Sequence, residues 1–179
     1  MAITIKRARR VVDLVTDLGL QEQYTDALRA MDAARGDTPY VAMEVGESAE
    51  VRTAAELVQQ IESKMQASTL RFTIEAVDRL RWNEHMAKHP ARDDNEADKA
   101  QGFDVSSIDG LLPESIKSVH DFDGKPYDFD PKAEWADLSA AMSDGQWSDF
   151  ASAVIVVNRG TDAPKSRAAS LVMRGSDKS

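Results

Sequence analysis

A stripe of apolar residues with alternating spacings of three and four most constrains how this 179-residue chain can fold. Such spacing forms the seam between two packed helices, and it predicts a helix over residues 49–67. About two and a half heptads are too few for an isolated helix to be stable, so the stripe requires a partner. That partner is either another helix of this chain or another subunit. The stripe consists of Val51, Ala54, Val58, Ile61 and Met65.

The apolar period changes directly after this helix. From Thr69 to Ile74 every second residue is apolar, which predicts a half-buried strand. Before the stripe, residues 3–34 predict another helix, since their larger apolar residues fall mostly on one face. Glycines and Pro39 between the two helices predict a linker near residues 36–48.

Two later helices carry clear start signals. Asp130 precedes Pro131, which suits a capping side chain followed by a proline at the first helical position. Ser143 and Gln146 have the spacing of a capping box. The faces of these helices predict one buried group, made of Trp135, Leu138, Trp147, Phe150 and Val154.

The other expectations are a helix ending before Pro90, a loop over 91–104, a short helix over 113–119 and a turn or small hairpin at Asp123–Gly124.

These elements predict a mainly α-helical protein with a minor β element. The expected parts are a helical arm over residues 1–68, a compact helical domain over 69–158 and a flexible tail over 159–179. Helix-breaking residues recur in the tail, and its sizeable apolar residues are only Leu171, Val172 and Met173. That is too little apolar surface to offset the ordering of about twenty residues.

The charge balance narrows the class of partner. The chain has 31 acidic and 22 basic side chains, a formal net charge of −9. Such a charge repels nucleic-acid phosphates and anionic lipid, so we expect neither as a partner. No apolar run approaches the roughly 20 residues of a membrane-spanning helix. We therefore expect a soluble intracellular protein that acts by binding other proteins.

Several residues are of the types found in metal or catalytic sites, but structural roles explain them more simply. His85 and His89 would share a helix face, but the residues around them do not fit a metalloprotease motif. The aspartates at 121, 123, 128 and 130 lack the spacing of a calcium-binding loop, and turn or capping roles explain them. There is no cysteine and no phosphate-binding or nucleophile motif. The expectation is no enzyme activity, no cofactor and no metal, with a metal-dependent enzyme using His85 and His89 as the opposing hypothesis.

From about residue 50 to 170 the sequence resembles tail assembly chaperones of long, non-contractile-tailed bacteriophages of actinobacteria. The order and spacing of short motifs carry the resemblance. They are Met65–Thr69, Phe72, Arg81–Trp82, His89–Arg92 with Asn95, Gly102–Phe103, Leu112–Ile116, Trp135 with Leu138, Ser143–Trp147, Asn158, Pro164–Ser166 and Ala169–Ser170.

The resemblance implies a protein that binds the long, helical tape-measure protein and keeps it soluble while tail tube subunits polymerise around it. It would act in the host cytoplasm during assembly and be absent from the mature virion. Tube subunits and self-association are further partners to consider. The candidate partner-binding residues are Val58, Ile61, Met65, Leu171, Val172 and Met173. The alternative is a structural tail or neck component retained in the virion, against which the single predicted strand argues.

Overall fold

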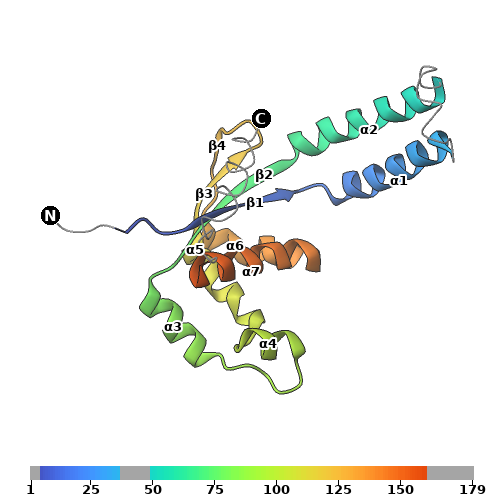
Figure 1. Cartoon of the computed structure of the whole chain (residues 1–179). Helices are drawn as coiled ribbons and strands as arrows, with labels where there is room; N and C mark the ends of the chain where they lie inside the picture. The colour runs from blue at the N-terminus through green and yellow to red at the C-terminus, as the bar shows by residue number, and fades with distance from the viewer. Residues whose placement is uncertain (1–4, 37–48, 161–179) are drawn as a thin grey trace, which may run out of the picture.

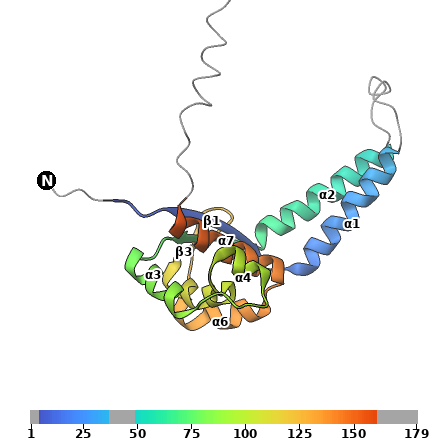
Figure 2. The same ribbon diagram turned by 60° about the horizontal axis from the view of Figure 1, so that its bottom comes forward.

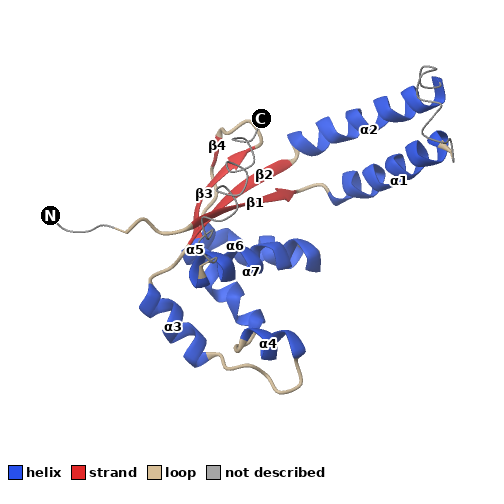
Figure 3. Cartoon of the chain, viewed as in Figure 1, coloured by secondary structure: helices blue, strands red, loops and turns tan. Residues whose placement is uncertain are grey.

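The computed structural model describes residues 5–36 and 49–160, and these residues are mainly helical, as predicted. They form seven α-helices, one 3-10 helix and a four-stranded antiparallel sheet in the order β1-β2-β3-β4 (Figure 3). The elements are β1 (Arg9–Val15), α1 (Leu18–Arg35), α2 (Ala49–Ala67), β2 (Thr69–Glu75), α3 (Arg79–Lys88), α4 (Glu96–Gln101), η2 (Val105–Leu111), α5 (Leu112–Ser115), β3 (Ile116–Asp121), β4 (Pro126–Tyr127), α6 (Pro131–Ala141) and α7 (Asp144–Arg159).

The predicted helix over residues 3–34 is wrong in its first half, where β1 pairs antiparallel with β2. Val12 and Leu14 are buried on one face of the strand, while Val11 is exposed on the other. The apolar spacing of this segment suits either period, and its β-branched residues favour the strand once β2 supplies a pairing partner. The helix begins instead at Leu18, because the Asp17 carboxylate caps it by accepting from the Gly19 N–H at 3.0 Å.

The partner of the apolar stripe on α2 is α1. The two helices form an antiparallel hairpin that continues the β1/β2 ladder and projects from the rest of the described chain (Figures 1 and 2). Its interior is a small cluster separate from the main core, in which Ala27, Val58 and Ile61 are buried. Of the predicted linker, Gly36 ends α1 with a φ of 59°, and residues 37–48 lie outside the described residues.

The predicted strand over 69–74 is confirmed as β2, but it belongs to a sheet of four strands. The helix predicted over 113–119 is wrong beyond Ser115, because β3 pairs with β2 from Ile116 onward. The hairpin at Asp123–Gly124 is confirmed and joins β3 to β4, with Gly124 at a φ of 85°. Strand pairing between distant segments therefore outweighed the local helical pattern in β3 as well as in β1.

The loop predicted over 91–104 contains a helix, α4, so that prediction is wrong for Glu96–Gln101. The Asn95 side chain accepts from the Asp98 N–H, and Gly102 ends the helix in the left-handed conformation with a φ of 76°. These two caps stabilise a helix too short and too polar to show an apolar period.

The other start signals are confirmed. Asp130 accepts from the Lys132 N–H at 2.9 Å, with Pro131 in the first turn of α6. Ser143 and Gln146 form the predicted capping box of α7. That helix continues through Arg159, so the first residue of the predicted tail is helical, whereas residues 161–179 lie outside the described residues.

The main core lies between the sheet and the helices that cover one of its faces. Phe72 of β2 is fully buried, with edge-to-face contacts to Phe129 and Phe150 at ring centroid distances of 5.4 and 5.1 Å. Phe150 also packs on Trp135 at 5.2 Å. The predicted core group of α6 and α7 is confirmed as one cluster, with Leu138 and Trp147 half-buried at its margin.

A single carboxylate, that of Asp109 in η2, connects both helices to this core. One oxygen of Asp109 accepts from the indole N–H groups of Trp135 at 3.0 Å and Trp147 at 3.1 Å, and from the hydroxyl of Ser139 at 2.8 Å. These bonds satisfy the indole N–H groups of Trp135, which is buried, and of Trp147, which is half-buried. Nothing in the sequence distinguishes Asp109 from the other acidic residues.

Asp109→Ala is expected to destabilise the fold by about 2 kcal/mol or more, because it leaves three donors without their acceptor. Asp109→Asn keeps a carbonyl oxygen that can accept the same bonds, so it should cost clearly less. Denaturant melts of both variants beside the parent chain measure the difference. Equal stability of the two variants would show that the three hydrogen bonds contribute little.

Candidate interaction surfaces

The partner-binding residues predicted on α2 line the interior of the α1/α2 hairpin. Val58 and Ile61 are buried against Ala27 of α1, and Met65 is half-buried beside them. A partner would therefore reach only Met65 of the three without separating the helices. The other predicted contacts, Leu171, Val172 and Met173, lie outside the described residues. The binding role of all six stays a prediction.

The outward face of α2 offers apolar surface at Leu57, a residue outside the predicted stripe, next to Ala54 of that stripe. Leu57 is 47% exposed and, with Ala54, lines a shallow hollow on this face. Glu50 and Glu56 border it, so an apolar patch is framed by carboxylates. Leu57 lies outside the stripe of spacings three and four, so it was not expected to pack inside the hairpin. A large apolar residue outside the stripe is the sequence signal that could have indicated this surface.

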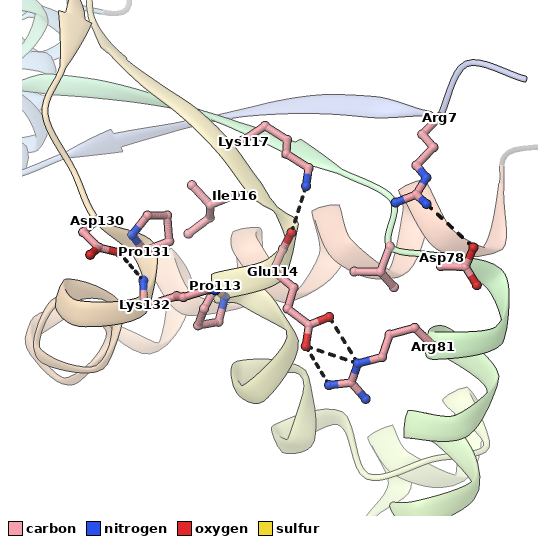
Figure 4. Close-up of a pocket in the computed structure, with 11 residues that line it drawn as sticks. Arg7, Asp78, Arg81, Pro113, Glu114, Ile116, Lys117, Asp130, Pro131 and Lys132 are labelled. Carbon is pink, nitrogen blue, oxygen red and sulfur yellow. Dashed lines mark hydrogen bonds and ion pairs between the residues drawn. The ribbon is translucent and has the colours of Figure 1, made fainter.

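A second hollow lies between α3, α5 and the start of α6 and is lined by charged side chains (Figure 4). Arg81 donates to both carboxylate oxygens of Glu114, with Nη2–Oε1 at 2.8 Å and Nε–Oε2 at 3.1 Å. Hydrogen bonding from Arg81 lowers the pKa of Glu114. Arg7 approaches Asp78 at 3.7 Å. Because the ion pair with Arg81 stabilises the charged form of Glu114, this carboxylate is poorly suited to act as a general base.

The two histidines connect α3 to η2. Their rings lie 4.4 Å apart, and Nε2 of His85 lies 3.0 Å from both the carbonyl oxygen and the hydroxyl of Ser107. Burial lowers the pKa of His85, and the proximity of His89 lowers it further. Within the described ranges, no group of three or more histidine, aspartate or glutamate side chains is placed to hold a metal ion.

Two of the four aspartates between 121 and 130 have the predicted turn and capping roles. The Asp121 carboxylate accepts from the Lys125 N–H at 2.8 Å within the β3/β4 hairpin, and Asp130 caps α6. These contacts account for Asp121 and Asp130 without a cation.

The sequence analysis missed the most strongly organised carboxylate, that of Asp98. Asp98 is fully buried and accepts from Nε of Arg92 at 2.6 Å and from the N–H of Val105 at 3.0 Å. Hydrogen bonding from Arg92 is the main cause that lowers its pKa to about 2. Arg92 also pairs with Asp104 at 3.1 Å. Asp98 thereby fixes the path of the chain from α3 through α4 into η2.

None of the helices in the described ranges is long and apolar enough to cross a bilayer. No protein-family model, curated protein or solved structure matches this chain.

The carboxylate of Asp98 is expected to titrate well below 3.8, with a pKa near 2. Because the folded pKa is depressed, Asp98 contributes stability above the unfolded pKa, and that contribution is lost as the pH falls from about 4 through 2. The difference in melting temperature between the parent chain and Asp98→Asn should therefore be large at pH 7 and shrink over this range. Carboxyl carbon NMR gives the pKa directly, and titration near pH 4 would contradict the buried ion pair.

Proposed function

We propose that this protein is a tail assembly chaperone, which binds a tape-measure protein in the host cytoplasm and keeps it soluble until the tail tube forms. It is then released and is absent from the virion. The motif order described above suggests the family. The observation that carries the proposal in the fold is the projecting α1/α2 hairpin, whose outward face has the exposed Leu57 beside the half-buried Ala54 in one hollow.

A projecting helical hairpin suits a helical partner because helices bind one another by placing apolar anchors into the grooves of a neighbouring helix. The hairpin keeps its own interior closed, so its outer face is available without unfolding. The carboxylates of Glu50 and Glu56 border this face. Together with the net charge of −9 they would keep a chaperone-coated partner soluble.

We further propose that the protein works by binding and not by catalysis. In the charged hollow of Figure 4 the carboxylates of Glu114 and Asp78 are paired with arginines. His85, the buried histidine, is engaged with Ser107. The ion pair of Arg81 with Glu114 connects α3 to α5, and the contact of His85 with Ser107 connects α3 to η2. Both contacts therefore suit a structural role.

The alternative, a tail or neck component retained in the virion, gains support from the sheet. A single predicted strand counted against a structural component, whereas the described residues contain four strands. Mass spectrometry of purified virions of a phage that encodes this chain separates the two proposals. We expect peptides of this chain in infected cells and not in virions, and stoichiometric amounts in virions would favour the structural component.

Leu57→Gln is expected to weaken binding of the tape-measure protein without a change in the melting temperature. Gln is a good helix former, and Leu57 is exposed, so neither the helix nor the hairpin interior should suffer. Leu80→Gln is the matched control, since Leu80 is also an exposed helical leucine but lies on α3, outside the hairpin. The measurement is the amount of tape-measure protein kept soluble on co-expression with each variant, with recovery of the complex in high salt.

Loss of solubilisation by Leu57→Gln alone would support the outward face of α2 as the contact surface. Equal loss by both variants would point to a nonspecific apolar contact. If the parent chain leaves the tape-measure protein as insoluble as it is alone, the chaperone proposal is wrong.

A further inference from the structure

The two edges of the sheet differ sharply. At one edge β4 has only two residues, and the first is Pro126. A very short strand with a proline is a common protection against pairing with another chain. At the other edge β1 has seven residues without proline, and its Val11 is 57% exposed. The edge formed by β1 therefore lacks the protection that the β4 edge has.

The register of β1 on β2 identifies the backbone groups that face outward. Thr16 N–H donates to the Ser68 carbonyl at 2.9 Å, and Ala76 N–H donates to the Ala8 carbonyl at 3.0 Å. Hydrogen-bonded pairs recur every second residue in an antiparallel ladder, so the even-numbered residues of β1 bond to β2. The N–H and C=O groups of Arg9, Val11, Asp13 and Val15 consequently point away from the sheet.

One contact supports this assignment and limits the open edge. The Gln146 side-chain amide at the start of α7 donates to the Val15 carbonyl at 2.9 Å, so that carbonyl does face outward. Within residues 5–36 and 49–160, no hydrogen bond engages the outward backbone groups of Arg9, Val11 and Asp13. The open segment therefore extends from Arg9 to Asp13.

The side chains of this segment are complementary to themselves when the strand is reversed. Arg9, Val11 and Asp13 share the exposed face of β1, in the order positive, apolar, negative. A two-fold axis at Val11 places Arg9 opposite Asp13 of a second copy, twice, and Val11 opposite Val11. In this register the outward backbone groups also meet each other. A slip by two residues in either direction would instead place Val11 opposite a charge, which costs favourable cross-strand pairs.

The charges on β2 extend this complementarity. Arg9 already pairs with Glu75 at 2.6 Å, and Asp13 with Arg71 at 3.4 Å. Across two copies these ion pairs would form rows of four side chains with alternating sign, running Glu75, Arg9, Asp13, Arg71. No like charges meet within such a row, so the row itself adds no repulsion to the pairing.

We propose that two copies of this chain associate through their β1 edges, in antiparallel register about Val11, to form one continuous eight-stranded sheet. Because β1 runs into α1, the two α1/α2 hairpins then project from opposite ends of the shared sheet. This interface is independent of the proposed chaperone function, since it uses β1 and not the outward face of α2.

Sedimentation velocity of the full chain over a range of micromolar concentrations gives the first test. The mass should rise from the 19.7 kDa of one chain to twice that value. A single chain at every concentration would overturn the proposal, and the edge would then be left for a strand of a different protein.

A cysteine variant tests the register. The natural chain has no cysteine, so Val11→Cys introduces its sole thiol. Directly opposed residues of a hydrogen-bonded antiparallel pair have Cα atoms about 5.5 Å apart, within the range of about 4.4–6.8 Å that a disulfide spans. Mild oxidation should link Val11→Cys into a covalent dimer, while Leu80→Cys, at an exposed position on α3, should not become covalently linked. A dimer that forms in solution but does not become linked at Val11 would overturn this register.

Exchange of the charges at positions 9 and 13 gives a further test, because a folding defect would not be reversed by mixing two variants. Arg9→Glu and Asp13→Arg should each be monomeric, because each places like charges opposite one another at both symmetric positions. Mixing the two variants restores both oppositions, so the mixture should sediment as a heterodimer. Circular dichroism melts establish that each variant is folded before mixing. Failure of the folded mixture to associate would overturn the proposed pairing.

Discussion

The antiparallel pairing of β1 with β2 is the interaction on which the rest of the structure depends. It places Val12 beside Phe72, and β3 adds Val119 to the same row, so three segments of the chain share one apolar face. Phe150 of α7 and Phe129 pack on Phe72 from that side. The same ladder forms the base of the α1/α2 hairpin, since α2 ends two residues before β2 begins and α1 begins three residues after β1 ends. The hairpin therefore takes its direction from the sheet.

Two hydrogen-bonded carboxylates, those of Asp109 and Asp98, position helices that the apolar contacts alone do not fix. Asp109 accepts from both indole groups of the α6/α7 region, and Asp98 accepts from Arg92 and from backbone N–H groups around η2. Asp98 is fully buried and requires such partners, while Asp109 is half-buried and joins three donors from α6 and α7, so each carboxylate fixes the position of several segments at once. In this acidic chain, some of the carboxylates serve the interior, and the others leave the surface negatively charged.

Two surfaces remain available beyond this framework. The outward face of α2 has an apolar patch bordered by carboxylates, which suits a helical partner. The β1 edge offers backbone groups and self-complementary charges, which suit a second copy. In the proposed dimer the hairpins point in opposite directions, so two patches would lie at the ends of one elongated particle. A long filamentous partner could then be contacted at two separated positions, with the gain in effective concentration that two linked sites provide.

The start signals of α6 and α7 and the apolar stripe of α2 were determined by the sequence alone, because they depend on residues within one or two helical turns. Asp130, Ser143 with Gln146, and the seam of Val58 and Ile61 all lie where local physical rules place them. The strand β2 was equally evident from its period. By contrast, β1 and β3 were predicted as helix, because a short apolar pattern fits both periods until a pairing partner is present.

The sequence also left open what would cover the stripe of α2, and only the tertiary structure identified α1. The exposure of Leu57 and the open backbone groups of β1 likewise depend on segments that are distant in the chain. Local interactions could therefore be derived from the sequence, whereas hydrogen bonds and contacts between distant residues were decided only when the sheet brought those residues together.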